Sequence, residues 1–193
     1  DARYYSTSCG LDLQMDLSED SVFAAFLQED QIRSVEAEEP FFRWKESISL
    51  IDLQEKTEWK TVDKLHVAER NAKGAVTCLE ITGQKKSAEL EKVTERIEGE
   101  YQIRQFLAQA DQILTLQDGS TRKGWQLLPS AFFYLQPVTE EGILTGYEIC
   151  GGGYGHGEGM SQNGARNMAE QGENYEEILK NYYGEIRIVR YSS

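Results

Sequence analysis

Apolar side chains recur at helical spacing near the C-terminal end of the chain. Spacings of three and four residues place them on one face of a helix over residues 175–183. These residues are Tyr175, Ile178, Leu179, Tyr182 and Tyr183. A capping-box pattern precedes this helix and a glycine follows it. A second helix is predicted over residues 160–171, so two consecutive helices separated by Gly172 are expected.

Three earlier stretches also favour helix. Residues 18–27 combine a capping serine with apolar residues at helical spacing, which predicts a short helix. Residues 99–107 place three apolar side chains on one helix face. Residues 50–61 are weakly patterned and are expected to hold a short helix.

The stretches between these helices are typical of strands. Residues 41–50 are rich in aromatic and β-branched side chains, which predicts a strand. Residues 62–70 and 75–81 flank a turn-forming tetrapeptide at 71–74, so they are expected to form a β-hairpin. His66 would be an ordinary strand residue of this hairpin.

Three further strands and one loop complete the expected fold. Residues 127–135 and 142–150 are apolar runs bounded by turn residues, and residues 186–191 are expected to finish the chain as a strand. The charged segment 84–95 is expected to be an exposed loop or short arm. The sequence therefore predicts an α+β fold with mixed, mainly antiparallel strands and two consecutive C-terminal helices.

Charge excludes several classes of partner. The 193 residues include 33 acidic and 20 basic side chains, a formal net charge of −13. Nucleic-acid binding is not expected, because neutralising phosphates requires clustered Lys and Arg. An electrostatic grip on anionic wall polymers or on lipid headgroups is also not expected. No apolar run approaches the roughly 20 residues that span a bilayer, so we expect no membrane contact by this chain.

Cysteine and histidine spacing indicates no metal site. Cys9, Cys78 and Cys150 are widely separated, and His66 and His156 are the only histidines. Two of the cysteines could pair in an extracellular protein, although separate buried thiols are the favoured interpretation. We expect neither a metal nor another cofactor.

A glycine-rich segment, residues 151–164, is the most distinctive feature of the sequence. It holds seven of the 17 glycines, and His156 stands between Gly155 and Gly157. Such a run has a high cost in backbone entropy and favours a tight conformation with close approach to a ligand. The helix that follows would present backbone N–H groups to a polar ligand at its N-terminus. An incidental glycine-rich loop is the alternative.

The motif GYGHGEGMSQNGA at residues 153–165, with the helix pair after it, resembles the C-terminal signature of the SpoIID/LytB family. That family includes a sporulation peptidoglycan lytic transglycosylase and an amidase enhancer. Weaker likenesses cover residues 5–10, 70–79 and 99–107. The resemblance implies that residues 1–193 are the C-terminal portion of a SpoIID-like domain whose catalytic acid lies in a segment upstream of Asp1.

The resemblance also implies a set of substrate-binding residues. They are Ser6, Ser8, Gly155, His156, Gly157, Ser161 and Gln162. The catalytic residue is unknown, because it would belong to the upstream segment. Glu158 is interpreted as surface variation, and Arg104 as an ion-pairing residue that orients its helix.

Two functions follow as hypotheses. The first is binding and cleavage of peptidoglycan glycan strands as part of a lytic transglycosylase. The second is a non-catalytic cell-wall-binding module that enhances a partner amidase. Whether the intact protein is an enzyme depends on the upstream segment, which is also where an export signal or anchor for an extracytoplasmic, wall-facing protein is expected. A third possibility, a purely structural glycine loop, would require residues 151–164 to be buried.

Overall fold

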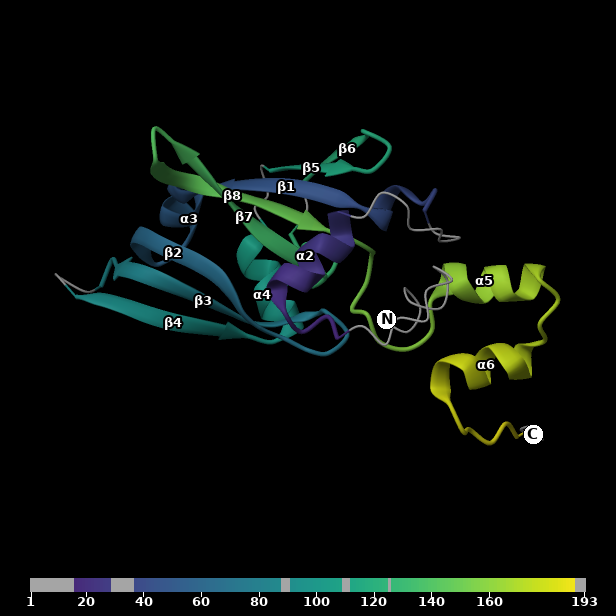
Figure 1. Cartoon of the computed structure of the whole chain (residues 1–193). Coiled ribbons are helices and arrows are strands. Elements are labelled where there is room, and N and C mark those ends of the chain that lie inside the picture. Colours follow the sequence, from purple (N-terminus) through teal and green to yellow (C-terminus); the bar gives the residue numbers. More distant parts are fainter. Residues whose placement is uncertain (1–15, 29–36, 88–90, 109–111, 125, 190–193) are drawn as a thin grey trace. The chain divides into compact units, whose positions relative to one another are not determined.

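The computed structural model describes residues 16–28, 37–87, 91–108, 112–124 and 126–189. The chain divides into two compact units. The larger unit consists of Met15–Asp30 and Glu39–His156, and the smaller one includes Gly157–Ser193. Figure 1 shows the elements of both units.

Two antiparallel sheets make up most of the larger unit. The five-stranded sheet has the order β6-β5-β1-β8-β7, and the three-stranded sheet has the order β2-β3-β4. The strands of the first are β1 (Trp44–Ser49), β5 (Ile113–Leu116), β6 (Thr121–Lys123), β7 (Phe133–Glu140) and β8 (Ile143–Gly151). Those of the second are β2 (Trp59–Arg70), β3 (Val76–Lys85) and β4 (Lys92–Glu98).

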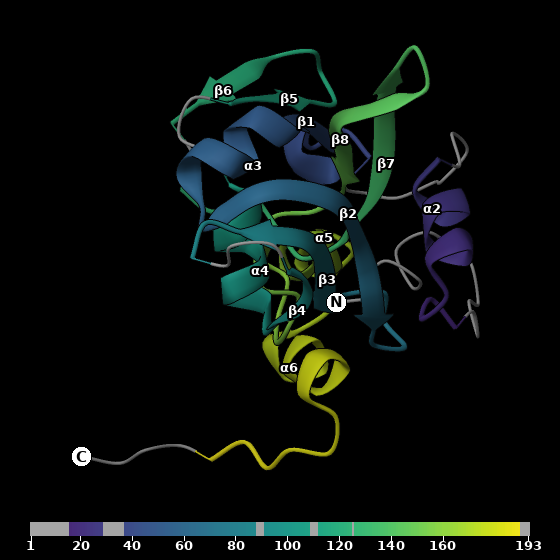
Figure 2. The ribbon, with the colours of Figure 1, turned by 90° about the vertical axis from the view of Figure 1, so that its left-hand side faces the viewer.

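Short helices pack on these sheets. They are α2 (Asp20–Gln28), the 3-10 helix η1 (Pro40–Phe42), α3 (Leu50–Lys56) and α4 (Glu100–Leu107). Helix α3 contacts β1, β2 and β8, α4 contacts β3 and β4, and α2 contacts β7. In Figure 2, α2 lies on the opposite side of the larger unit from α3 and α4.

One hydrophobic core joins the two sheets. Strand β1 alternates buried and exposed positions, so Trp44 and Ile48 point inward while Lys45 does not. The same core includes Leu79 of β3 and Ile103 of α4, which are both fully buried. Each large apolar side chain buried in this way stabilises the fold by about 1.5–3 kcal/mol.

A buried arginine connects α2 to the hairpin and to β7. Arg70 pairs with Asp20 through a 2.9 Å bond from Nε, and its other nitrogens donate to the carbonyl oxygens of Gly74 (3.0 Å) and Phe133 (2.6 Å). Its guanidinium also lies 4.1 Å from the ring centre of Phe23. Burial lowers the pKa of Arg70, and the Asp20 carboxylate opposes that shift.

The described part of the smaller unit contains two consecutive helices, α5 (Gln162–Glu170) and α6 (Tyr175–Tyr183). The predicted capping box is present: Asn174 accepts the N–H of Glu177, whose side chain accepts the N–H of Asn174. Gly184 ends α6 at a φ of 71°. These observations confirm the predicted α+β class and the C-terminal helix pair.

Other sequence-based predictions were wrong in position or type. Strands extend into both ends of the segment 84–95, which was expected to be an exposed loop or short arm, because β3 continues to Lys85 and β4 begins at Lys92. Residues 127–132 precede β7 instead of opening a strand. Residues 186–189 form no strand, and the N–H of Ile186 donates to the carbonyl of Gly184 in a turn.

Candidate functional site

Gly151, the first residue of the glycine-rich segment, is also the last residue of β8. Gly151 pairs with Trp44 of β1 on one side and with Phe133 of β7 on the other. A Cβ added at Gly151 would lie 2.2 Å from an atom of the buried Trp44 ring. Glycine is therefore required here by close packing against an indole.

Backbone hydrogen bonds hold the next residues of the segment in place. The N–H of Gly152 donates to Phe132 O (2.9 Å), and the N–H of Gly153 donates to Phe41 O (2.8 Å). The indole N–H of Trp44 donates in turn to Gly153 O (3.1 Å). The segment thus leaves the sheet along a fixed path that needs no exposed side chain to define it.

A second set of bonds ties the segment to residues 128–130. The N–H of Gly155 donates to Pro129 O (2.9 Å), and Ser130 Oγ donates to Gly152 O (2.7 Å). Ser130 is itself almost completely buried, at 1% exposure. Pro129 and Ser130 therefore support the glycine-rich segment at two of its residues.

Arg104 fixes these supporting residues in turn. Its Nε donates to Leu128 O (2.7 Å) and its Nη2 to Pro129 O (3.1 Å), while Nη1 forms an ion pair with Glu100. The ion pair along α4 confirms the role expected from the sequence. The structure adds a second role, because the carbonyl of Pro129 that accepts from Arg104 also accepts from Gly155. Arg104 is thus a positioning residue for the segment.

Positive φ angles alternate along the segment. They occur at Gly153 (76°), Gly155 (126°), Gly157 (77°) and Gly159 (75°), a region that residues with a Cβ rarely adopt. The four residues that follow these glycines are exposed: Tyr154, His156, Glu158 and Met160. The glycine spacing therefore has a backbone cause, and the segment is not a wholly buried loop.

The predicted site residues fall in three places. Gly155 and His156 are the last two residues of the larger unit, whereas Gly157, Ser161 and Gln162 belong to the smaller unit. Ser6 and Ser8 lie outside the described residues. The expected approach of the N-terminal turn to His156 stays a prediction.

Ser161 and Gln162 stand at the start of α5. Ser161 is its N-cap, and Ser161 Oγ accepts the N–H of Gly164 at 3.2 Å. Gln162 is the first helical residue and is exposed. At least one role of Ser161 is therefore structural, because an N-cap serine typically stabilises a helix by about 1 kcal/mol.

The sequence interpretation missed Tyr154 as a site residue. Its side chain is 68% exposed, and its ring centre lies 4.9 Å from that of Phe41 at an interplanar angle of 44°. An aromatic residue between two glycines of a surface segment is a signal that could have identified it.

The buried thiols are unsuited to nucleophilic chemistry. Cys78 and Cys150 are both free and buried, as the favoured interpretation of separate thiols expected, while Cys9 lies outside the described residues. Burial raises the pKa of Cys150 above its ordinary value of 9.0, and it raises that of Cys78 as well. Both thiols are therefore protonated at neutral pH, whereas a nucleophile or a metal ligand would have to be a thiolate.

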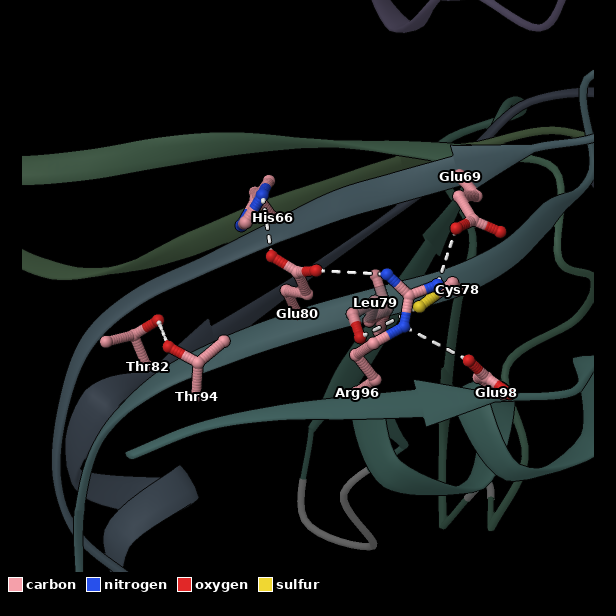
Figure 3. A network of polar contacts seen from close by, with 9 residues as sticks. All are labelled: His66, Glu69, Cys78, Leu79, Glu80, Thr82, Thr94, Arg96 and Glu98. Carbon is pink, nitrogen blue, oxygen red and sulfur yellow. Dashed lines mark hydrogen bonds and ion pairs between the residues drawn. The ribbon is translucent and has the colours of Figure 1, made fainter. Parts of the chain in front are cut away.

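Charged side chains cover the outer face of the three-stranded sheet, as Figure 3 shows. Arg96 contacts Glu69 (2.5 Å), Glu80 (3.1 Å) and Glu98 (3.1 Å). Hydrogen bonds to Glu69 and then Glu98 raise the pKa of Arg96. His66 lies in β2, which confirms that this histidine is a strand residue, and its Nε2 lies 3.6 Å from Glu80.

The described residues contain no group of three or more His, Cys, Asp or Glu side chains arranged to hold a metal ion. In the same residues, no helix has the length and apolar character needed to cross a membrane.

Residues 3–159 match a domain family described as "Domain of unknown function (DUF8618)". The chain belongs to this family. The DUF8618 match ends three residues beyond His156, the last residue of the larger unit. Helices α5 and α6 therefore lie outside the matched region.

Two relatives are similar over shorter stretches. An uncharacterised protein of Brachyspira hyodysenteriae is 42% identical over 79 residues, which cover 41% of this chain and 20% of that protein. The amidase enhancer of Bacillus subtilis is 48% identical over 54 residues, which cover 28% of this chain and 8% of that protein. The matched part is thus a fifth or less of each relative's length.

Proposed function

We propose that this DUF8618 domain binds the glycan strands of peptidoglycan through its glycine-rich segment and thereby enhances a partner cell-wall amidase. The observation that carries the proposal is the 48% identity to an amidase enhancer, together with the SpoIID/LytB-like motif at residues 153–165. On this proposal the intact protein is extracytoplasmic and faces the wall.

The chemistry of the segment suits a polyhydroxylated ligand. The exposed imidazole of His156 offers one donor and one acceptor in its neutral form, which matches sugar hydroxyl groups. The backbone beneath it is held by hydrogen bonds to Phe41 and Pro129, so little ordering is required on binding. A net charge of −13 favours neutral sugar groups over anionic polymers as the recognised chemistry.

Glycan binding would enhance an amidase through effective concentration. An amidase cuts the bond between a glycan strand and its peptide, so a module that holds the strand keeps the enzyme beside further bonds of the same kind. Such tethering raises overall avidity by roughly 10²–10⁴ without any new contact at the catalytic centre.

A second candidate function is glycan cleavage as part of a lytic transglycosylase. The resemblance of residues 153–165 and the following helix pair to the SpoIID/LytB signature supports it, because that family includes such an enzyme. A carboxylic acid would have to protonate the leaving glycosidic oxygen, and the resemblance assigns this acid to a segment upstream of Asp1. We therefore expect residues 1–193 alone to release no anhydro-muropeptides.

The test compares the only two histidines of the chain. The intact protein is pelleted with purified peptidoglycan, and the bound fraction is measured. The bound fraction of His156→Ala is compared with that of His66→Ala, the matched control. We expect His156→Ala to weaken binding about tenfold or more, because the loss of hydrogen bonds to a ligand is worth about 1–3 kcal/mol. His66→Ala should bind like the wild type.

The same preparations are then assayed with a cell-wall amidase. Peptide release should rise with the intact protein and fall back with His156→Ala. Anhydro-muropeptides released without any amidase would instead support the transglycosylase. Failure of the wild-type protein to bind peptidoglycan would contradict both functions.

A further inference from the structure

Tyr154 forms an exposed aromatic surface supported from below. Its ring packs against Phe41 at 4.9 Å between centres, and Phe41 in turn packs against the hydrophobic core of the larger unit. Yet 68% of Tyr154 remains exposed. A large aromatic side chain that is anchored on one side and open on the other is a suitable surface for a flat ligand.

The backbone on both sides of Tyr154 is fixed. The N–H of Gly153 donates to Phe41 O (2.8 Å), and the N–H of Gly155 donates to Pro129 O (2.9 Å). Because the peptide groups before and after the tyrosine are tied to different parts of the fold, the ring is positioned before any ligand arrives. Such preorganisation reduces the entropy lost on binding.

Space is open at Gly155, the residue that follows Tyr154. Apart from its chain neighbours Tyr154 and His156, no described residue has an atom within 4 Å of the position that a Cβ on Gly155 would take. Gly155 also has a φ of 126°, which a bulkier residue would rarely adopt. A ligand lying on Tyr154 could therefore extend over Gly155 without meeting a described side chain other than that of its neighbour His156.

The surroundings favour a neutral sugar ring over other flat or cationic ligands. A nucleotide would bring phosphates to a chain with a net charge of −13, which carries 33 acidic and only 20 basic residues. Quaternary ammonium groups are bound by several aromatic faces together, whereas Tyr154 offers one exposed ring with Phe41 beneath it. The C–H face of a pyranose needs a single aromatic face and carries no charge.

We propose that Tyr154, supported by Phe41, is a stacking platform for one pyranose ring of the glycan strand. This inference deepens the proposed function and rests on it. Stacking would leave the sugar hydroxyl groups at the edge of the pyranose ring free to bond other groups, and the exposed His156 follows two residues along the segment.

The test uses the intact protein and bare glycan strands, prepared by removing the peptides from peptidoglycan with an amidase. Binding is measured by calorimetry for the wild type, Tyr154→Ala, Tyr154→Phe and Tyr101→Ala. Tyr101 is the matched control because it is 55% exposed on α4 of the same unit. Thermal unfolding of each variant checks that the fold is intact.

We expect Tyr154→Ala to weaken binding about tenfold, while Tyr154→Phe, which keeps the ring, and Tyr101→Ala bind like the wild type. If Tyr154→Ala binds as tightly as the wild type, the platform is wrong and the proposed function stands. Equal losses in Tyr154→Ala and Tyr101→Ala would also overturn it. Choline binding that depends on Tyr154, with no binding of glycan by the wild type, would overturn both proposals.

Discussion

Residues 151–156 of the glycine-rich segment and the outer face of the three-stranded sheet both belong to the larger unit, but they are stabilised in opposite ways. On the sheet, side chains bind one another: Arg96 contacts three carboxylates, and His66 pairs with Glu80. In the segment, the backbone is bound, through Gly152, Gly153 and Gly155. Side chains such as Tyr154 and His156 extend from it into solvent.

This difference matters for recognising a site. On the sheet face, Arg96 and its three carboxylates already satisfy one another, so a ligand would have to break those contacts. The segment needs no exposed side chain to keep its shape, so its side chains can change partners at little cost to the fold. A fixed backbone with exposed side chains is therefore a better indication of a candidate binding surface here than a high density of charged residues.

The largest expected effect comes from Gly151→Ala. Its Cβ would displace the Trp44 ring, which donates to Gly153, so we expect a loss of about 3 kcal/mol in the free energy of unfolding. Gly142→Ala in the turn before β8 is the control. Gly142 has a positive φ but no described atom near its Cβ position, so backbone strain alone should cost about 1 kcal/mol. Urea unfolding measures both, and equal losses would show that close packing at Gly151 is not decisive.

A smaller effect is expected from Arg104→Met. The carbonyls of Leu128 and Pro129 would lose a charged donor, which should reduce the free energy of unfolding by about 2 kcal/mol. Glycan binding should weaken too, because Pro129 also holds Gly155. Arg122→Met, at an exposed position on β6, is the matched control and should change neither quantity. Unchanged glycan binding in Arg104→Met would disprove its role in positioning the segment.

The smallest effect is expected from Arg96→Gln. Although three carboxylates surround this arginine, the pairs are exposed to solvent, and such pairs contribute little. The midpoint of thermal unfolding should fall by less than about 4 °C, and the difference should shrink in 1 M salt because exposed charges are then screened. A large fall that survives high salt would mean that the network is a major source of stability, and the contrast between the two regions would disappear.

Elements with their own local signals could be predicted from the sequence. Helix α6 carries a capping box at Asn174 and an end signal at Gly184, and both are present in the structure. The hairpin β2–β3 follows from the turn residues at 71–74, where the side chain of Asn71 accepts two backbone N–H groups. Such signals act within a few residues of chain, so no knowledge of the tertiary structure is required.

Elements that depend on distant partners could not be predicted. Strand β4 exists because it pairs with β3, whereas its own charged side chains, such as Arg96 opposite Glu80, make its sequence resemble a loop. Residues 127–132 are apolar like a strand, but the carbonyls of Leu128 and Pro129 accept from Arg104, 24 and 25 residues away. A pattern of apolar residues says which side chains are buried and not where their backbone groups bond.

The candidate site could be predicted only in part, because some of its contacts also join residues that are distant in the sequence. The glycine spacing identified the segment and the exposed His156 within it. Neither the support from Pro129 nor the ring contact between Tyr154 and Phe41 could be derived, because each joins residues distant in the sequence. Tyr154 became a candidate only once its exposure and its partner were known together.

The alternation of positive φ at Gly153, Gly155, Gly157 and Gly159 has a consequence for chirality. These four positions disfavour L-amino acids but suit their mirror images, since a D-residue prefers positive φ. We therefore expect a semisynthetic protein with D-alanine at Gly155, whose φ is 126°, to keep the backbone path. The residue after each of these glycines has no positive φ, so the identities of Tyr154, His156, Glu158 and Met160 can change without altering the handedness of the backbone.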